Sequence, residues 1–289
     1  MVKLLSEDAP AKINLYLRVT GRRPDGYHEL DSIFVPIALC DRVRIELRPN
    51  ATSSVTLRCD STDLPVDERN IAHRAAVDFL ATFAIDGQVL IDLSKRIPVG
   101  AGLGGGSSDA GAVLRMLATM CRISDASKLA ALALNLGADV PFFLQPKPAR
   151  IGGIGERIAP LERFPHLHLV LVAPAFEVST AEVFRLLESR QWSGPASAEY
   201  LRKILRQEFE ADLLVNDLAA VATIKWPAIG ALIAMLNDAG ASAAAMTGSG
   251  SAVFGLFPTA DAATRAAHQV SERAPEARVF NVGSYQPAQ

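Results

Sequence analysis

Alternation of apolar and polar residues predicts that the chain begins with strands. In residues 11–19 every second side chain is apolar, so one face of this segment is hydrophobic and the other is polar. That period of two is typical of a half-buried β-strand. Short apolar or alternating segments predict four more strands in the first part of the chain, at 30–39, 43–47, 55–59 and 89–93.

Helices are predicted where apolar residues recur every three or four positions. In residues 70–83 the apolar side chains Ile71, Ala75, Phe79 and Phe83 follow this spacing. The same criterion predicts helices at 107–121, 124–136, 180–189, 198–206, 228–239 and 259–273. Later strands are predicted at 167–172, 243–246, 252–257 and 279–284, and a glycine-punctuated hairpin is predicted at 149–158.

The order of these elements indicates an α+β fold with two domains. In the first half strands come first and helices arrive late, unlike the regular alternation of a doubly wound α/β sheet. The second half has a βαββαβ-like order. We place the domain boundary near Arg163, which gives residues 1–163 and 164–289 as the two domains.

Composition and charge narrow the class of protein. The 289 residues are 49% hydrophobic and 21% charged, and the net charge of −2 provides no strong attraction for nucleic acid or acidic lipid. No apolar run approaches the roughly 18 residues of a membrane helix, and the early acidic residues are unlike a secretion signal. The three cysteines and five histidines show no metal-ligand spacing. We therefore expect a cytoplasmic protein, monomeric or weakly dimeric, with no metal site of its own side chains and no nucleic-acid or membrane partner.

A glycine-rich stretch at 98–108 is the strongest candidate for chemistry. Glycine lets a backbone approach a ligand closely, although it raises the entropic cost of ordering the loop. A strand is predicted before the stretch and a helix after it, so unpaired N–H groups and the positive end of a helix dipole meet at one place, which suits a phosphate. The two serines are good N-cap residues for that helix. One serine suffices for a cap, so either could instead reach Mg²⁺ or a β-phosphate oxygen. The predicted phosphate-binding residues are Pro98, Val99, Gly100, Ala101, Gly102, Leu103, Gly104, Gly105, Gly106, Ser107 and Ser108.

Other kinds of glycine-rich loop fit this stretch less well. The P-loop of nucleotide hydrolases needs a lysine after its last glycine, and none is present. The dinucleotide fingerprint is formally matched by Gly100, Gly102 and Gly105, but the acidic residue at the expected distance, Asp125, does not follow a predicted strand. A flexible linker is also disfavoured, because linkers rarely lie between a buried strand and a capped helix.

Asp139 is the candidate general base, with Lys12 as its partner. Asp139 lies in the segment A-D-V-P-F-F, where Pro141 is expected to force Val140 out of helical geometry. A carboxylate among apolar residues needs a partner, and Lys12 lies on the polar face of the first predicted strand. A nearby ammonium would keep the acid ionised. A buried ion pair with only a structural role is the alternative.

Tyr27 and His28 are candidates for binding a nucleobase. They follow a Pro-Asp-Gly turn. Their flat faces and hydrogen-bonding edges suit stacking on a base and reading it. An ordinary exposed hairpin would have the same sequence, so both interpretations stay open.

Three further residues are weaker candidates for substrate binding. Thr180 and Phe184 lie one helical turn apart at the start of a predicted helix, and Asn14 shares the polar strand face of Lys12. A second glycine-serine turn at 247–251 either places its amides against the same phosphates or is only a tight hairpin.

Several segments together resemble the GHMP kinases (galactokinase, homoserine, mevalonate and phosphomevalonate kinases). The glycine stretch resembles the P-x-x-x-G-L-G-x-G-S-S loop of this superfamily. The other matching motifs are P-A-K-I-N-L-Y-L, G-R-R-P-D-G-Y-H-E-L-D-S, L-G-A-D-V-P-F-F, G-I-G-E-R-I, S-T-A-E-V-F, N-D-L and M-T-G-S-G-S-A-V-F, in that order. The Tyr-His turn is the most discriminating, because other GHMP kinases are not expected to carry it.

The resemblance implies an ATP-dependent small-molecule kinase, with Mg²⁺ carried by the nucleotide and a substrate linked to cytidine diphosphate. Lys12 and Asp139 match the catalytic pair of the family, and Tyr27, His28 and Phe184 match a cytidine pocket. The implied fold is a first half like ribosomal protein S5 domain 2 and a ferredoxin-like second half. The alternatives are another small-molecule GHMP kinase, such as a mevalonate or homoserine kinase, and a nucleotide-binding protein without catalysis.

Overall fold

Two long strands, β1 (Lys3–Arg22) and β2 (His28–Arg48), run through most of the first fifty residues. The computed structural model describes residues 1–209 and 213–286. The chain forms two compact units. The first consists of Met1–Ala11, Leu39–Ile97 and Gly104–Pro146, and the second of Lys12–Ala38, Pro98–Leu103 and Lys147–Gln289. Because β1 and β2 each contribute to both units, the units do not follow the single cut near residue 163, and that domain boundary stays a prediction.

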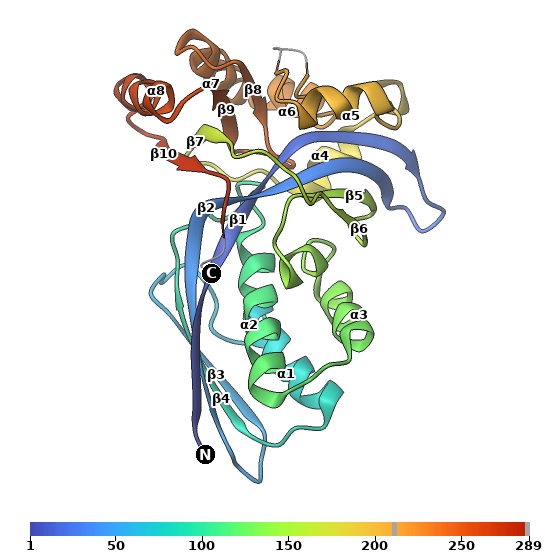
Figure 1. Ribbon diagram of the computed structural model, residues 1–289, viewed down its shortest axis with the longest axis vertical. Helices are drawn as coiled ribbons and strands as arrows, with labels where there is room; N and C mark the ends of the chain where they lie inside the picture. The colour runs from blue at the N-terminus through green and yellow to red at the C-terminus, as the bar shows by residue number, and fades with distance from the viewer. Residues whose placement is uncertain (210–212, 287–289) are drawn as a thin grey trace. The chain divides into compact units, whose positions relative to one another are not determined.

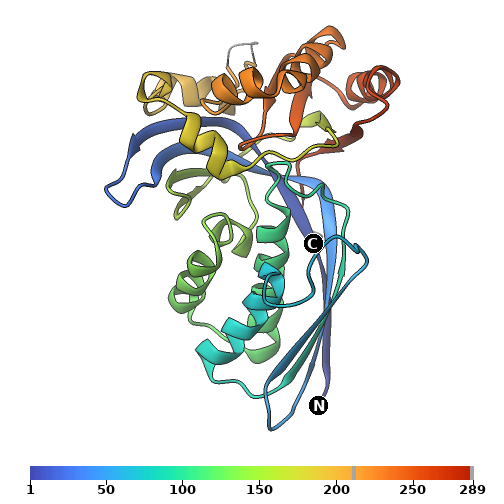
Figure 2. The same ribbon diagram turned by 180° about the vertical axis from the view of Figure 1, so that it is seen from behind.

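The first unit packs helices on a small sheet. Strand β4 (Gln88–Ser94) pairs in parallel with β3 (Ser54–Cys59) and antiparallel with the end of β2, where Arg42 lies opposite Ser94. Figures 1 and 2 show α1 (Ile71–Phe83) and α2 (Gly105–Cys121) side by side on one face of these strands. Helix α3 (Ala126–Leu136) and the short 3₁₀ helix η1 (Pro141–Leu144) complete the unit.

The two strands predicted at 30–39 and 43–47 are one continuous strand, β2, so the predicted interruption is wrong. Asp41 lies in the gap between the two predicted strands, and it is fully buried. One oxygen of its carboxylate accepts the backbone N–H groups of Arg96 and Ile97, at 2.6 and 2.9 Å. These hydrogen bonds compensate for the burial of the charge, so the strand continues through a polar residue.

The second unit contains an antiparallel four-stranded sheet in the order β10-β7-β9-β8. The strands are β7 (His168–Ala173), β8 (Ala243–Met246), β9 (Val253–Phe257) and β10 (Arg278–Gly283). Numbered along the chain, this order is four-one-three-two, the ferredoxin-like arrangement. Helices α7 (Pro227–Asp238) and α8 (Ala260–Arg273) lie on the same side of the sheet in Figure 1 and bury apolar residues against it.

The remaining elements of the second unit are short. The predicted hairpin is present as β5 (Ala149–Gly153) and β6 (Arg157–Pro160), with β5 paired to the first part of β2. Helices α4 (Thr180–Leu186) and α5 (Ala198–Leu205) are present as predicted, with ends that differ by one to three residues. The 3₁₀ helix η2 (Ser189–Gln191) and helix α6 (Ala219–Lys225) were not predicted. The three residues of η2 are too few for a helical period to stand out.

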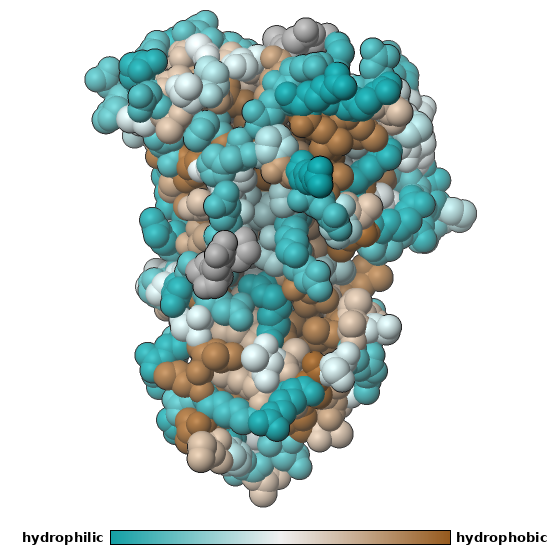
Figure 3. Space-filling view, viewed as in Figure 1, coloured by the Kyte–Doolittle hydropathy of each residue, from teal (hydrophilic) through white to brown (hydrophobic). Residues whose placement is uncertain are grey.

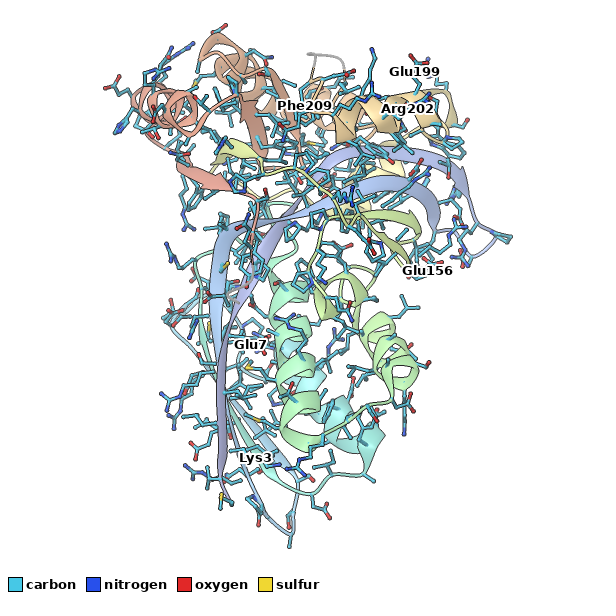
Figure 4. All side chains as sticks on the ribbon, viewed as in Figure 1. Lys3, Glu7, Glu156, Glu199, Arg202 and Phe209 are labelled. Carbon is cyan, nitrogen blue, oxygen red and sulfur yellow. The ribbon has the colours of Figure 1, made fainter. Side chains whose placement is uncertain are left out.

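Helix α5 is amphipathic, with a polar face toward solvent and an apolar face toward the core. Figure 3 shows hydrophilic side chains over this helix, and Figure 4 shows Glu199 and Arg202 pointing away from it. On the opposite face Ile204 is fully buried. Charges of both signs on the outer face and an apolar inner face are typical of a surface helix.

None of the helices in the described ranges is by itself long and apolar enough to cross a membrane. Helices α6 and α7 together reach the required length and hydropathy, but the chain bends by 110° between them.

Phe79 in α1 provides a test of the core of the first unit. Its side chain is fully buried, so Phe79→Ala is expected to lower the free energy of unfolding by about 3–5 kcal/mol. Val77 on the same helix is 42% exposed, and Val77→Ala should change it by less than about 0.5 kcal/mol. Urea unfolding of both variants measures the difference. Similar losses in the two variants would contradict this description of the core.

Candidate active site

The glycine-rich loop joins β4 to α2 and depends on left-handed backbone conformations. Gly100, Gly102 and Gly104 have φ angles of +66°, +75° and +69°. Side chains disfavour this region and glycine does not. The spacing of the glycines therefore follows from the path of the backbone.

The predicted capping role of Ser107 and Ser108 is wrong. Helix α2 begins at Gly105, its N-cap is Gly104, and no side chain caps it. Because the left-handed Gly104 already starts the helix, both serines lie inside its first turn. The first N–H groups of a helix have no acceptor within the helix, so they stay available to a ligand at this end of α2.

Carbonyl groups anchor the first half of the loop. The oxygens of Gly100, Ala101 and Leu103 accept backbone N–H groups of Val178, Ala252 and Lys12, at 3.4, 3.2 and 3.0 Å. All six residues belong to the second unit. The carbonyls are therefore directed into the fold, and they fix the path of the loop without using a side chain.

The turn at 247–251 packs directly on this loop. A Cβ atom added at Gly102 would lie 2.5 Å from the carbonyl oxygen of Thr247 and 3.0 Å from that of Gly250. In return, a Cβ atom at Gly248 would lie 2.8 Å from the carbonyl oxygen of Gly102. The turn is thus more than an isolated hairpin, because it supports the backbone of the glycine loop. Phosphate binding by its own amides stays a prediction.

Lys12 and Asn14 lie side by side, as the strand pattern predicted, but both are buried, so the predicted half-buried strand is wrong for this part of β1. The Lys12 ammonium donates to Asn14 Oδ1 at 2.7 Å and lies 4.6 Å from the centre of the Phe34 ring. Asn14 Oδ1 also accepts the backbone N–H of Gly248 at 2.9 Å, and Asn14 Nδ2 donates to Ser32 Oγ at 3.0 Å. Lys12 is only 4% exposed. The network therefore fixes the position of a buried positive charge and links it to the 247–251 turn.

Asp139 lies between α3 and η1 in the first unit. The residues that follow it, Val140, Phe142 and Phe143, are buried, which confirms the apolar surroundings predicted for this acid. The expectation that Val140 is not helical is wrong, because its φ and ψ angles are −62° and −40°. Pro141 occupies the first position of η1, where proline is tolerated. The pairing of Asp139 with Lys12 stays a prediction.

Of the aromatic candidates for base binding, the structure brings His28 and Phe184 into contact. The rings of His28 and Phe184 stack with centroids 5.0 Å apart and an angle of 25° between their planes. Trp192, which the sequence did not single out, meets His28 at 5.8 Å and 90°. Burial and the charge of Arg22 lower the pKa of His28, which favours the neutral ring. Tyr27 is 59% exposed.

Thr180 contacts the glycine-serine turn. Its hydroxyl shares a hydrogen bond of 2.7 Å with Ser249. The hydroxyl lies at the start of α4, and Phe184 lies one turn further along the same helix. Helix α4 therefore connects the turn at 247–251 to the stacked rings.

Sequence reasoning missed a buried ion-pair cluster at the start of α2. Lys95 donates to Asp41 and, at 2.7 Å, to Asp109. Burial raises the pKa of Asp109 to about 8, and the charge of Asp41 adds to this while Lys95 opposes it. In the sequence, the only indication of this cluster is that Lys95 precedes the glycine stretch and Asp109 follows it. Charged residues are common beside loops, so this indication is weak. The cluster joins β2, the end of β4 and α2.

Comparison with known proteins decides the family. The GHMP kinases N terminal domain matches residues 70–146, which include the glycine loop, and the GHMP kinases C terminal domain matches residues 197–276. The 4-diphosphocytidyl-2-C-methyl-D-erythritol kinase of Anaeromyxobacter dehalogenans strain 2CP-C is 46% identical over 271 residues, which are 92% of this chain and 85% of that one. This chain belongs to the GHMP kinases. It is an ATP-dependent small-molecule kinase, and the predicted resemblance is confirmed.

Solved structures agree with the α+β fold predicted for this GHMP kinase. A crystal structure of 4-(cytidine 5'-diphospho)-2C-methyl-D-erythritol kinase has a TM-score of 0.83 and 37% identity, and the match covers 98% of this chain and 100% of that one. A homoserine kinase from Cytophaga hutchinsonii has a TM-score of 0.76 at 17% identity, covering 99% and 96% of the two chains. At that identity the second likeness shows the fold alone.

Two glycine-to-alanine variants distinguish the effect of the contact between Gly102 and the 247–251 turn from the effect of the positive φ angle at Gly102. Gly240 also has a positive φ, +90°, but a Cβ atom there meets nothing within 4 Å. Gly240→Ala should therefore cost only the left-handed strain, about 1–2 kcal/mol of the free energy of unfolding. Gly102→Ala should cost clearly more, because two backbone oxygens cannot move aside. Urea unfolding compares the variants, and equal losses would contradict the close contact.

Proposed function

We propose that this kinase transfers the γ-phosphoryl group of ATP to the 2-hydroxyl of 4-diphosphocytidyl-2-C-methyl-D-erythritol, in the non-mevalonate route to isoprenoid precursors. The stacked rings of His28 and Phe184 carry this choice of substrate, because they offer a preformed flat surface to a nucleobase. The names of relatives that are 40–46% identical over most of their length support it.

The glycine loop and the start of α2 are proposed to bind the phosphates of ATP. Backbone N–H groups and the helix dipole at Gly105 and Gly106 favour negative charge there. Ser108 fits a Mg²⁺ ion that arrives with the nucleotide, since its buried hydroxyl has no hydrogen-bond partner among the described residues and hydroxyl oxygens suit this ion. When bound, the ion neutralises charge on the phosphate oxygens.

Asp139 is proposed as the general base and Lys12 as the cation that stabilises the reacting oxygen. Asp139 takes the proton of the 2-hydroxyl, the freed oxygen forms a bond to the γ-phosphorus, and the bond from that phosphorus to ADP breaks. The acceptor is a crowded tertiary alcohol. Its alignment is therefore a large part of the barrier reduction. The buried network of Asn14 supports the role of Lys12, because it holds the ammonium in one place.

The cytidine end of the substrate is proposed to supply the binding energy for this alignment. We assign base recognition to Tyr27, His28 and Phe184, and assign Thr180 and Asn14 to contacts with the rest of the substrate. The neutral His28 ring can donate and accept one hydrogen bond each, which suits the mixed edge of cytosine.

The cellular setting is proposed from more general features. Cys40, Cys59 and Cys121 are free thiols, which suits the reducing cytoplasm. The net charge of −2 supports neither a nucleic-acid nor a membrane partner. A monomer or weak homodimer is proposed.

A screen of phosphate acceptors tests the choice of substrate. We expect turnover with 4-diphosphocytidyl-2-C-methyl-D-erythritol and none with mevalonate or homoserine, because neither of these carries a base for His28 and Phe184. Release of ADP in a coupled assay measures each reaction. Turnover of mevalonate or homoserine alone would establish one of those kinases instead, and no turnover of any acceptor with intact ATP binding would favour a nucleotide-binding protein without catalysis.

Substitution of Asp139 tests the base. Asp139→Asn keeps the size and removes the proton acceptor, so kcat should fall by at least about 100-fold. Binding of a non-hydrolysable ATP analogue, measured by calorimetry, should not change. The exposed Asp63 provides a matched control, and Asp63→Asn should keep normal kcat. Near-normal turnover of Asp139→Asn would remove Asp139 from this role.

A further inference from the structure

His28 is held between two aromatic side chains, only one of which the proposed function uses. Phe184 stacks on its ring, and Trp192 meets the ring at a right angle. Perpendicular aromatic pairs at this distance attract each other. The Nε1 atom of Trp192 is buried and has no hydrogen-bond partner in the described part of the chain. The indole thus packs as a ring, without a hydrogen bond to orient it.

The chain after Trp192 is clamped by a first buried carboxylate. The backbone N–H and the hydroxyl of Ser193 donate to the two oxygens of Asp217, at 2.9 and 2.5 Å. Asp217 is 4% exposed and also accepts the N–H of Val19 in β1, at 2.7 Å. The N–H of Gly194 donates to the carbonyl of Val19 at 3.2 Å. These bonds attach the residue next to Trp192 to β1.

A second buried carboxylate holds the other end of the same connection. The N–H of Ala196 donates to Asp31 Oδ2 at 2.8 Å. Asp31 lies three residues after His28, is 5% exposed, and forms a bidentate ion pair with Arg150 at 2.9 and 2.8 Å. Burial acts to raise the pKa of Asp31, but the hydrogen bonds from Arg150, Ala196 and Tyr16 lower it overall, so the acid stays charged.

Two buried carboxylates outside the connection, Asp31 and Asp217, thus accept hydrogen bonds from residues within 193–196. Hydrogen bonds to an ionised carboxylate, such as that from Ala196 to Asp31, are stronger than bonds between neutral groups. These hydrogen bonds hold the segment that carries Trp192, and the Trp192 ring packs against His28.

We propose that Trp192 is a positioning residue for recognition of the nucleobase: its indole fixes the His28 ring on Phe184, and Asp31 and Asp217 hold residues 192–196 so that this aromatic site is formed before the substrate binds. This inference rests on the proposed cytidine-binding role of His28. It adds a specificity residue and two carboxylates that support it.

Kinetics of two Trp192 variants test the positioning role. Trp192→Ala should raise the KM for the cytidyl substrate by about 10-fold, the equivalent of one aromatic pair, and leave kcat and the KM for ATP unchanged. Trp192→Phe keeps a ring and should restore the KM. Equal losses in both variants, or an equal rise of both KM values in Trp192→Ala, would overturn the proposal.

Fluorescence provides a second measurement that does not depend on variants of Trp192. The chain has two tryptophans, so Trp226→Phe leaves Trp192 as the only indole. Addition of cytidine diphosphate should change its emission, with the half-saturation found for the same ligand by calorimetry, and ATP alone should not. If calorimetry shows that cytidine diphosphate binds but neither the emission nor the KM responds, the role of Trp192 is overturned and the proposed function stands. If cytidine diphosphate does not bind at all, the proposed substrate fails together with this inference.

Discussion

The close contact of two glycine backbones, Gly102 and Gly248, is the constraint on which the candidate site depends. A Cβ atom at Gly248 would meet the backbone of Gly102, a Cβ atom at Gly102 would meet the backbone of Thr247 and Gly250, and both glycines have a positive φ. Neither position can therefore accept a side chain without moving a backbone. The benefit is a glycine loop in which the carbonyls of Gly100, Ala101 and Leu103 are bonded within the fold, so the conformation of this part of the loop is set without a ligand. Preorganised amides need no rearrangement when charge moves during phosphoryl transfer.

The same contact connects the phosphate loop to the groups proposed to act on the acceptor. Gly248 donates its N–H to Asn14 Oδ1, and that oxygen also receives the Lys12 ammonium. Thr180 at the start of α4 bonds Ser249 in the same turn, and α4 carries Phe184 to His28. Within the second unit, a displacement of the 247–251 turn would thus reach the lysine and the aromatic rings. Buried polar networks of this kind specify one arrangement, because a partly satisfied network costs more than none.

Periodicity and residue type predicted most of the fold and part of the site. The strand period placed Lys12 beside Asn14, and the glycine composition singled out the loop that is proposed to bind phosphate. The errors have local causes: Gly104 starts α2 in a left-handed conformation and makes serine caps unnecessary, and Asp41 lies in the middle of β2 because its hydrogen bonds come from distant residues. Trp192 could not be found, because its contact with His28 joins positions more than 160 residues apart in the chain.

The cluster at Lys95 explains how the start of α2 stays fixed without a cap. A single ammonium lies between the carboxylates of Asp41 and Asp109, so it can neutralise only one of them. Two charged acids this close and this deeply buried would repel each other. Burial and the nearby Asp41 raise the pKa of Asp109, which reduces this conflict because a proton on the Asp109 carboxyl removes one negative charge from the cluster. Less negative charge near the start of α2 leaves the positive end of its dipole less compensated, which favours the phosphate binding proposed for the amides of Gly105 and Gly106.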